Sequence, residues 1–599
     1  MFSLTRCALQ LQLWFLVSWL GVTSIAPRVA LGDRPALGEP IANFSVFDVC
    51  GRKQLLIPQD EAHATVLAFV GVECPISELS APRLQELYET FAPRGVRFLA
   101  INSDERTDME ALRVFANRHA LTLPVVKDYE QAVADSLGAT RTAEAFVLDH
   151  ELRLRYRGRI DDQYSITDRS VGVRKQQPDT PYLAAALGAL LDKRPIAIAE
   201  TPPLGCLIGR PSTVKQPTTL TYSRDIKPIV ARHCRSCHSA GEIAPFELLD
   251  YEDVKGWSGM IREVVVARRM PPWNADPCCG EFSNDRHLSE AEIATLTEWI
   301  DGGTPQGEPA PDTEDQTRVQ GWAIGKPDVV YEMPKSFSIP ATGTIKYQYF
   351  EVKTNFTEDR WVTAAEVRPG NRAVVHHLLV FAIDPQRPES WRRYQGGRAG
   401  YFAAMVPGER PAMYPSGAAK RLPANAMLLF QVHYTATGKP ETDRSRIGLR
   451  FATKDVRREV FTRSAYERQR LVIPASVANH TVMARHRFEE EGHLLSLLPH
   501  MHLRGEAFKY VIHYPVGHTP ASEVLLSVPR YDFGWQNTYR LATPKRIPAG
   551  SVLECTAVFN NSAHHPALTR DMWEKTVRWG PQIWDEMLIG YFDLVVEKP

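Results

Sequence analysis

Five consecutive residues, Cys234-Arg235-Ser236-Cys237-His238, place two thiols and an imidazole in the spacing CxxCH. Two cysteines at this spacing can add to the vinyl groups of a haem while the adjacent histidine binds the iron. The alternative is a disulfide or half of a zinc site, for which the only other close cysteine pair, Cys278-Cys279, is poorly spaced. The motif therefore predicts one covalent haem c on Cys234 and Cys237, with His238 as an axial ligand.

A second axial ligand is expected downstream of this motif, and Met260, Met270 and His287 are the candidates. Met270 directly precedes two prolines, which end a helix and would hold the thioether in a rigid loop. Ligation by methionine and histidine raises the reduction potential of a haem and suits electron transfer. We therefore predict Met270 as the second ligand.

Other potential metal ligands cluster in the C-terminal half of the sequence. His500 and His502 are two residues apart and would share one face of a strand, whereas adjacent His376 and His377 can share an ion only at a bulge or a strand end. Imidazoles suit copper and zinc, and a thioether selects Cu(I). We therefore predict two copper ions, one at a three-histidine site and one at a site of two histidines and a methionine. The residues involved are His376, His377, His433, His500, His502 and Met587.

Cys74 is the remaining candidate for chemistry. It lies between a strand-like run and a helical pattern, and a thiol at a helix N-terminus is stabilised as thiolate by the helix dipole. The motif is CPIS, so disulfide exchange within the motif is impossible. Cys50 and Cys206 are the candidates for a resolving partner, and either could equally be an inert thiol. If Cys74 pairs with one of them, the domain passes electrons, and if it does not, the domain is a docking or vestigial one.

The elements around Cys74 alternate between strand and helix. Residues 38–195 contain three strand-like runs (65–70, 96–102 and 145–148) and three helical patterns (79–91, 108–120 and 181–191). This alternation is typical of an α/β domain. A linker rich in Pro and Thr is expected at 196–219.

The later regions differ in their periodicity. Residues 220–306, around CxxCH, follow a helical pattern that ends in 289–300 with Gly302-Gly303 as a C-cap, so a small all-α domain is expected. A Pro-rich, acidic linker covers 307–325. The rest consists of short β-type runs between turns, enough for two all-β sandwiches, which we place at 326–470 and 471–599.

Length and charge limit the possible classes. A chain of 599 residues is too long for one core and should be multidomain. It has 70 basic and 70 acidic side chains and no basic stripe, so nucleic acid is not an expected partner.

Residues 1–32 have the pattern of a signal peptide. Arg6 supplies the positive charge, residues 9–25 the apolar region, and Ala30-Leu31-Gly32 a cleavage site. We expect an exported protein, periplasmic or extracellular, without a membrane span in its mature chain. The alternative is an uncleaved N-terminal membrane anchor.

Two N-terminal regions resemble known redox families. Residues 38–195 resemble redoxins of the peroxiredoxin and thioredoxin superfamily, although Gly71 replaces the peroxiredoxin threonine and Thr142-Ala143-Glu144 replaces the usual cis-proline region. Residues 222–307, with CRSCHSAGEIAPF and RRMPPW, resemble the cytochrome c-like domains of bacterial exported redox proteins. This second resemblance also favours Met270 as a ligand.

The segment at about 330–596 resembles the copper type II, ascorbate-dependent monooxygenases, the family of peptidylglycine and dopamine hydroxylases. The resemblance is carried by VVHHLLVFAI, LLFQVHYTATGK, LLPHMHLRGEAFKY and WGPQIWDEMLIGYFDL. It implies two jelly-roll sandwiches, with electron-storing copper at His376, His377 and His433 and O2-binding copper at the other three ligands. Leu498 stands where peptide-hydroxylating members carry an arginine, so peptidylglycine is not the expected substrate.

The leading hypothesis from the sequence is an exported copper monooxygenase that hydroxylates a small organic substrate with O2. His500, His502 and Met587 would be catalytic, and the fused haem would supply electrons, with ascorbate or a redox protein as further donors. Two alternatives remain: a non-enzymatic electron-transfer or copper-binding protein, and a thiol-dependent peroxidase or oxidoreductase acting through Cys74.

Overall fold

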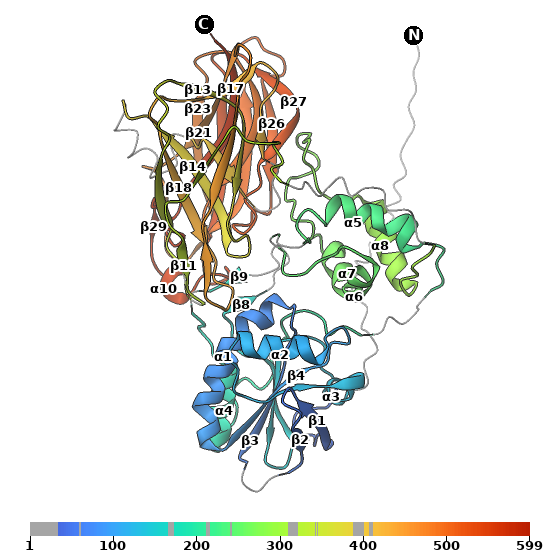
Figure 1. Cartoon of the computed structure of the whole chain (residues 1–599). Coiled ribbons are helices and arrows are strands. Elements are labelled where there is room, and N and C mark those ends of the chain that lie inside the picture. The colour runs from blue at the N-terminus through green and yellow to red at the C-terminus, as the bar shows by residue number, and fades with distance from the viewer. Residues whose placement is uncertain are drawn as a thin grey trace, which may run out of the picture.

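The computed structural model contains an α/β body, a small helical body and a large β-rich body, in that order along the chain (Figure 1). It describes residues 34–598 except 59–61, 166–172, 176, 211–215, 240–241, 243, 309–320, 342, 344, 387–399 and 407–410. The predicted signal peptide lies outside the described residues. Within them, no helix is both long and apolar enough to cross a membrane.

The first body is built on a seven-stranded sheet in the order β2-β1-β5-β4-β3-β6-β7. Its strands are β1 (Phe44–Asp48), β2 (Lys53–Leu56), β3 (Ala64–Phe69), β4 (Val96–Asn102), β5 (Val125–Lys127), β6 (Glu144–Asp149) and β7 (Leu154–Arg159). β3, β4 and β5 are parallel, while β6 and β7 run antiparallel to their neighbours. β3 is buried along its whole length, as expected for a central strand covered on both faces.

Helices cover both faces of this sheet. α1 (Pro75–Phe91), α2 (Met109–Arg118) and α4 (Tyr182–Leu191) pack on the face that carries Val66 and Ala68. α3 (Ala132–Leu137) packs on the face that carries Leu67 and Phe69. The three predicted strand runs and three predicted helices of the α/β domain are confirmed. A small hairpin, β8 (Tyr164–Ser165) with β9 (Val173–Arg174), lies beyond β7.

Part of the segment predicted as a linker belongs to this body. Glu200 forms a β-bridge with Arg157, and Leu207 forms one with Arg141. The chain from about 199 to 208 is therefore held against the first domain by backbone hydrogen bonds, which its Pro and Thr content did not indicate.

The second body is all-α. Its helices are α5 (Lys227–His233), α6 (Tyr251–Gly256), α7 (Ser258–Val266) and α8 (Glu290–Asp301), and one π-helical turn at Tyr222–Ile226 precedes α5. A capping box between Ser289 and Glu292 begins α8, and Gly302 caps its end. Trp299 is fully buried, and its indole N–H donates to Pro305 O at 2.9 Å.

The third body contains a nine-stranded sheet in the order β10-β20-β13-β17-β21-β30-β24-β27, with β16 paired to β13. Its strands are β10 (Val329–Glu332), β13 (Arg360–Arg368), β16 (Ala412–Met413), β17 (Ala418–Leu422), β20 (Arg446–Phe451), β21 (Arg458–Tyr466), β24 (Gly492–His500), β27 (Tyr539–Ile547) and β30 (Ile589–Glu597). Two four-stranded sheets accompany it. One has the order β12 (Gln348–Lys353), β18 (Met427–Tyr434), β14 (Val375–Ile383) and β15 (Ala403–Met405). The other has the order β23 (Val477–Arg487), β28 (Val552–Asn561), β25 (Gly505–His513) and β26 (Ser522–Val528).

Short elements complete the β-rich body. β11 (Phe337–Ile339) pairs with β19 (Glu441–Asp443), β22 (Val472–Ile473) pairs with β29 (Val577–Arg578), and α10 (Arg570–Trp573) is a single turn.

The two predicted sandwiches have separate hydrophobic cores but share the nine-stranded sheet. β17 of the first half pairs in parallel with β21 of the second. β21 also pairs along its length with β30, so the second half already includes residue 458. We placed the boundary near residue 470, because the sequence pattern does not reveal which half a strand joins.

Candidate functional site

Cys74 caps the N-terminus of α1, directly after the central strand β3. Pro75 occupies the first helical turn, where its missing N–H costs no hydrogen bond. The preceding loop is closed by the N–H of Gly71, which donates to Ser77 Oγ at 3.0 Å. A methyl group on Gly71 would lie 2.7 Å from Thr142 Cγ2, so the threonine expected of a peroxiredoxin does not fit here.

The second thiol of this site comes from residues 204–208, which we call the strap. The strap lies against the loop before β6, where the N–H of Thr142 donates to Cys206 O at 2.9 Å and the N–H of Ile208 donates to Thr140 O at 3.0 Å. These bonds hold Cys206 beside Cys74, whose Sγ accepts a hydrogen bond from the Cys206 N–H at 3.4 Å. Both cysteines are buried, with exposed fractions of 2% for Cys74 and 8% for Cys206.

The surroundings of Cys74 favour its thiolate. Burial alone would raise the pKa of this thiol, but hydrogen bonds from the side chains of Cys206 and Thr142 and from the backbone of Cys206 and Ser77 outweigh it and lower the pKa to about 6. The same contact with Cys74, together with burial, raises the pKa of Cys206 well above its ordinary value. The site therefore pairs one thiolate with one protonated thiol, as disulfide exchange requires.

Cys50, the other predicted partner, does not share this arrangement. It lies in the turn between β1 and β2, is exposed, and donates its N–H to Asp48 Oδ1 at 2.9 Å. The structure therefore favours Cys206 over Cys50 as the partner of Cys74.

The low pKa makes the reactivity of Cys74 dependent on pH in a defined window. We expect its alkylation rate by iodoacetamide to rise as pH increases through about 6 and to level off above pH 7. An ordinary thiol would still gain reactivity up to about pH 8.5. Mass spectrometry of the modified peptide gives the rate, and exposed Cys50 in the same sample serves as the reference. A Cys74 rate that continues to rise above pH 8 would contradict the described hydrogen bonding.

The strap depends on Gly205, whose φ is +113°. A methyl group there would lie 1.9 Å from Thr142 O, so Gly205→Ala must displace the strap and should destabilise the domain by about 1–3 kcal/mol. It should also raise the apparent pKa of Cys74. Gly188 in α4 is the matched control, because a Cβ there meets nothing within 4 Å and Gly188→Ala should be neutral or stabilise by ~0.5–1 kcal/mol. Denaturant unfolding compares the two variants.

The CxxCH motif forms one turn at the end of α5. The N–H groups of Cys237 and His238 both donate to Cys234 O, at 3.1 and 3.0 Å. Nδ1 of His238 lies 3.1 Å from Phe246 O, which fixes the ring and leaves Nε2 available as a ligand. Burial raises the pKa of Cys234 to about 12. The three predicted haem-binding residues therefore lie together on one turn, and their geometry fits the predicted attachment.

Met270 and His287, two of the candidates for the second axial position, line one cavity of about 590 Å³ at the edge of the helical body. His238 is not among the residues that line it. Met260 instead points to the strap, where its Sδ accepts a hydrogen bond from the N–H of Leu207 at 3.2 Å. Met270 as an axial ligand stays a prediction.

His376, His377 and His433 form a compact cluster. One ring nitrogen from each histidine lies within 4.8 Å of those from the other two, and His433 Nδ1 is 3.1 Å from His377 Nε2. The register of β14 against β18 shifts between Val375 and His377, which is the bulge that adjacent histidines need in order to face one ion. Nδ1 of His376 is buried without a hydrogen-bond partner, as expected of a nitrogen placed to bind a metal. Burial lowers the pKa of His376 to about 4, so its imidazole is neutral.

His500 and His502 also come together, with ring centroids 5.2 Å apart. Nδ1 of His500 lies 2.6 Å from Gln536 Oε1. Met587 is also buried, and the carboxylate of the preceding Glu586 accepts hydrogen bonds from the N–H groups of His502, at 2.9 Å, and Met587, at 3.2 Å. One buried carboxylate thus holds the backbone of two of the three predicted ligands, His502 and Met587.

The two histidine sets meet at Phe533. Its ring centroid lies 5.9 Å from that of His376, 5.7 Å from that of His433 and 6.0 Å from that of His502. The sequence did not single out Phe533, Gln536 or Glu586. Of these three residues, only Glu586 could have been suspected from the sequence, because it directly precedes the predicted ligand Met587.

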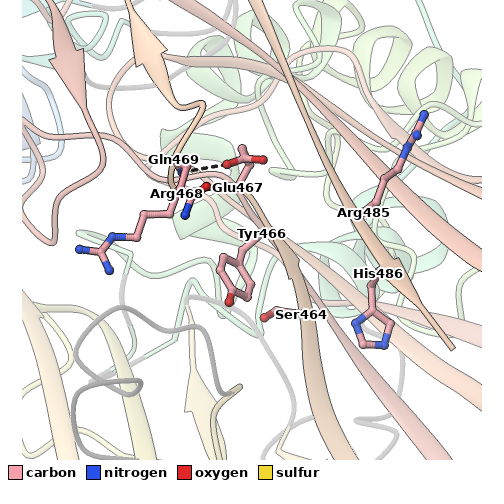
Figure 2. A pocket seen from close by; sticks show the side chains of 7 residues that line it. All are labelled: Ser464, Tyr466, Glu467, Arg468, Gln469, Arg485 and His486. Atoms are coloured by element: carbon pink, nitrogen blue, oxygen red, sulfur yellow. Dashed lines mark hydrogen bonds between the residues drawn. The ribbon is translucent and has the colours of Figure 1, made fainter. Parts of the chain in front are cut away.

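A further pocket of about 680 Å³ lies between β21 and β23 (Figure 2). Its lining is polar: Ser464, Tyr466, Glu467, Arg468, Gln469, Arg485 and His486. Glu467 accepts a hydrogen bond from the Gln469 N–H at 2.8 Å, which rigidifies one rim. None of the predicted catalytic, haem-binding or copper-binding residues lines this pocket.

The fold around Cys74 and Cys206 defines a thioredoxin-like redox domain. The model of the AhpC/TSA family matches residues 37–163. The thiol-disulfide oxidoreductase ResA of Geobacillus thermodenitrificans (strain NG80-2) is 30% identical over 138 residues, which is 23% of this chain and 77% of that protein. ResA of Bacillus thuringiensis (strain Al Hakam) is 29% identical over 119 residues, 20% of this chain and 67% of that protein. Through this domain the chain belongs to the AhpC/TSA family and is a relative of ResA.

Solved structures to which the chain is similar include an uncharacterized conserved protein from Geobacillus kaustophilus. It is 30% identical, covers 30% of this chain and 94% of its own, and has a TM-score of 0.27. StoA from Bacillus subtilis is 19% identical, covers 20% of this chain and 89% of its own, and has a TM-score of 0.19.

These comparisons contradict the hypothesis of a copper monooxygenase supplied with electrons by a haem. The named relatives are thiol-disulfide oxidoreductases, and the matched family model ends at residue 163. That hypothesis was wrong because it placed the chemistry in the C-terminal histidines and kept the thiol reaction of Cys74 only as an alternative. The oxidoreductase class is supported, through the thiol alternative. The resemblances of the later regions to cytochrome c and to copper monooxygenases gain no support from these matches.

Proposed function

We propose that this protein is a thiol–disulfide oxidoreductase in which Cys74 attacks a substrate disulfide and Cys206 resolves the product. The observation that carries the proposal is the hydrogen bond from the backbone N–H of Cys206 to Cys74 Sγ at 3.4 Å, which places the cysteine of the strap beside the cysteine of the helix N-terminus. The pair replaces the second cysteine that the CPIS motif lacks.

The chemistry balances as a two-electron exchange. The Cys74 thiolate attacks one sulfur of the substrate disulfide, forms a mixed disulfide and releases the other sulfur as a thiolate. Cys206 then loses its proton to solvent or to the leaving thiolate and attacks Cys74 Sγ, which releases the second substrate thiol. The substrate has gained two electrons, the protein holds a Cys74–Cys206 disulfide, and an external dithiol must reduce that disulfide before the next cycle.

The proposal is tested by oxidising the full-length protein with glutathione disulfide and mapping its disulfides by mass spectrometry. A peptide pair joined through Cys74 and Cys206 is expected, and dithiothreitol should release it. Cys50 is the internal control, since exposed Cys50 should carry only glutathione. Glutathione on Cys74 without any link to Cys206 would reject the resolving role.

A second proposal concerns a metal ion, because the three-histidine cluster is built for one. His376, His377 and His433 would hold copper, which imidazole ligands suit, in a binding or electron-storing role. His500, His502 and Met587 are proposed as a second copper site. Copper would supply one-electron redox chemistry at these positions.

Replacing His433 by Ala should weaken binding of copper at the cluster by at least about 100-fold, because outer-shell changes alone typically cost 10–100-fold. Equilibrium dialysis followed by metal analysis gives the affinity. His518→Ala is the control, because His518 is exposed and its ring contacts Pro520 O. Equal copper affinity of both variants and the parent protein would show that the three-histidine cluster does not bind copper.

A third proposal is that Cys234, Cys237 and His238 would hold haem c, with Met270 as a further iron ligand. The fit rests on the single turn of the motif and on the bond between His238 and Phe246 O. The absorption spectrum of the pyridine complex after expression with haem attachment is the test, and Cys234→Ala should abolish covalent retention. Export, which the segment 1–32 suggests, is proposed with it, because haem is attached outside the cytoplasm.

A further inference from the structure

The Cys74–Cys206 site is closed by another part of the same chain. One hydrophobic cluster joins Cys74 and Cys206 of the first domain to Ile226, Val230 and Trp257 of the helical body. Because Cys74 is only 2% exposed, a disulfide substrate reaches its sulfur only when this cluster opens, so the helical body slows the reaction.

Three directional contacts hold the helical body on this face. Nη2 of Arg141 pairs with Glu263 Oε2 of α7 at 2.5 Å. The N–H of Leu207, next to Cys206, donates to Met260 Sδ of α7 at 3.2 Å. The guanidinium of Arg106 lies 4.1 Å from the centre of a Trp257 ring. One acidic, one thioether and one aromatic side chain of the helical body therefore contact the rim of the thiol site.

The two arginines are held in place by their own domain. Arg106 is bound by Asp104, with Nη2 2.5 Å from Oδ2 and Nε 2.9 Å from Oδ1. Arg141 also donates from Nη1 to Gly205 O of the strap at 2.8 Å. Arginines held in place in this way recognise aromatic rings and carboxylates well, because little side-chain entropy is lost on binding.

We propose that α6 and α7 occupy the substrate-docking face of the Cys74–Cys206 site, and that Arg106 and Arg141 bind an acidic, aromatic-bearing protein segment once the helical body is displaced. This proposal rests on the proposed thiol–disulfide function. It adds the chemistry of the substrate segment and the way in which access to Cys74 is controlled. Glu263 and Trp257 act as an internal substitute for the partner, and a substrate must compete with them.

Access to Cys74 is tested first, by iodoacetamide labelling of the full-length protein. Glu263→Lys places a cation beside Arg141 and should weaken the docking of the helical body. Cys74 labelling should then be ~10-fold faster or more, which is the size of effect that one site of a protein typically has on another. Arg141→Glu breaks the same pair from the other side and should do the same. The double variant restores an ion pair and should return to the slow rate, which simple misfolding of either variant cannot produce.

The matched control is Arg262→Gln, also on α7, whose ion pair with Asp301 at 3.1 Å lies within the helical body. It should leave the labelling rate unchanged. Labelling of Glu263→Lys and Arg141→Glu at the parent rate would overturn the proposal. This readout needs no disulfide chemistry, so it stands apart from the disulfide mapping that decides the proposed function.

Recognition is tested with disulfide-linked dimers of two synthetic peptides, one with Asp and Trp beside its cysteine and one with Lys and Trp. The Glu263→Lys protein should react at least ~10-fold faster with the acidic dimer, because a bound carboxylate pairs with Arg141. Adding Arg106→Gln should reduce this preference. Equal rates with the two dimers would overturn the assigned partner chemistry.

Discussion

Replacing Cys74 by Ser is expected to lower the rate of disulfide reduction by at least ~10³-fold, as loss of a nucleophile typically does. The thiolate is the attacking group, and a serine hydroxyl at the same helix N-terminus is not ionised at neutral pH. Turnover of a model disulfide with dithiothreitol as reductant gives the rate. Cys50→Ser is the control, since Cys50 is exposed and lies in a different turn. Equal loss in both variants would argue against a specific nucleophile.

Cys206→Ser should fail at the next step. Cys74 can still attack, so the first thiol of the substrate is released, but the mixed disulfide has no partner to resolve it. We expect a stable adduct on Cys74, seen as a mass increase that dithiothreitol removes. A variant that turns over normally without accumulating the adduct would show that another group resolves the intermediate.

Arg504→Met is expected to reduce the free energy of unfolding by about 1–3 kcal/mol for each buried acceptor that it leaves without a donor. Arg504 is 1% exposed, and its guanidinium donates to Asn561 Oδ1 and Trp584 O at 2.8 and 2.9 Å. Glu586 is a fully buried carboxyl nearby, and burial raises its pKa to about 7. The positive charge of Arg504 acts in the opposite direction and favours the carboxylate. Without the guanidinium, these acceptors lose their donor and the carboxylate loses its counter-charge.

Denaturant unfolding of metal-free protein measures this loss. Arg485→Met is the matched control, because the Arg485 guanidinium is also bonded, to the Glu554 carboxylate at 2.6 Å, but its side chain is 65% exposed. Exposed pairs contribute only about 0–1 kcal/mol, so this control should change stability little. Similar losses in the two variants would mean that burial of Arg504 does not set its contribution.

The sequence predicts local features of the fold better than contacts between distant segments. The strand before Cys74 and the helix after it follow from apolar runs and a proline at the first turn, and the structure contains both. The bulge at His376 could be anticipated because two adjacent side chains cannot otherwise share a face. Such features depend on near neighbours in the chain.

The pairing of Cys74 with Cys206 could only be left as one of two options. It depends on ten or so residues of an apparent linker returning to the domain, and on a backbone bond from Thr142 that no pattern in the sequence reveals. Phe533 and Gln536 were missed for the same reason. Each lies in an irregular segment whose contacts with the histidines are set by tertiary packing.

The parallel pairing of β17 with β21 has a consequence for protein engineering. Only two residue pairs define this junction, Ala418 with Arg458 and Ala419 with Glu459, yet it makes one sheet of two halves. A fragment that ends before residue 458 would leave the β17 edge without its neighbour, and such open edges favour aggregation. Fragments for expression should therefore keep both halves. A chimera that takes one half from a homologue would need a β17 edge and a β21 edge that can still pair with each other.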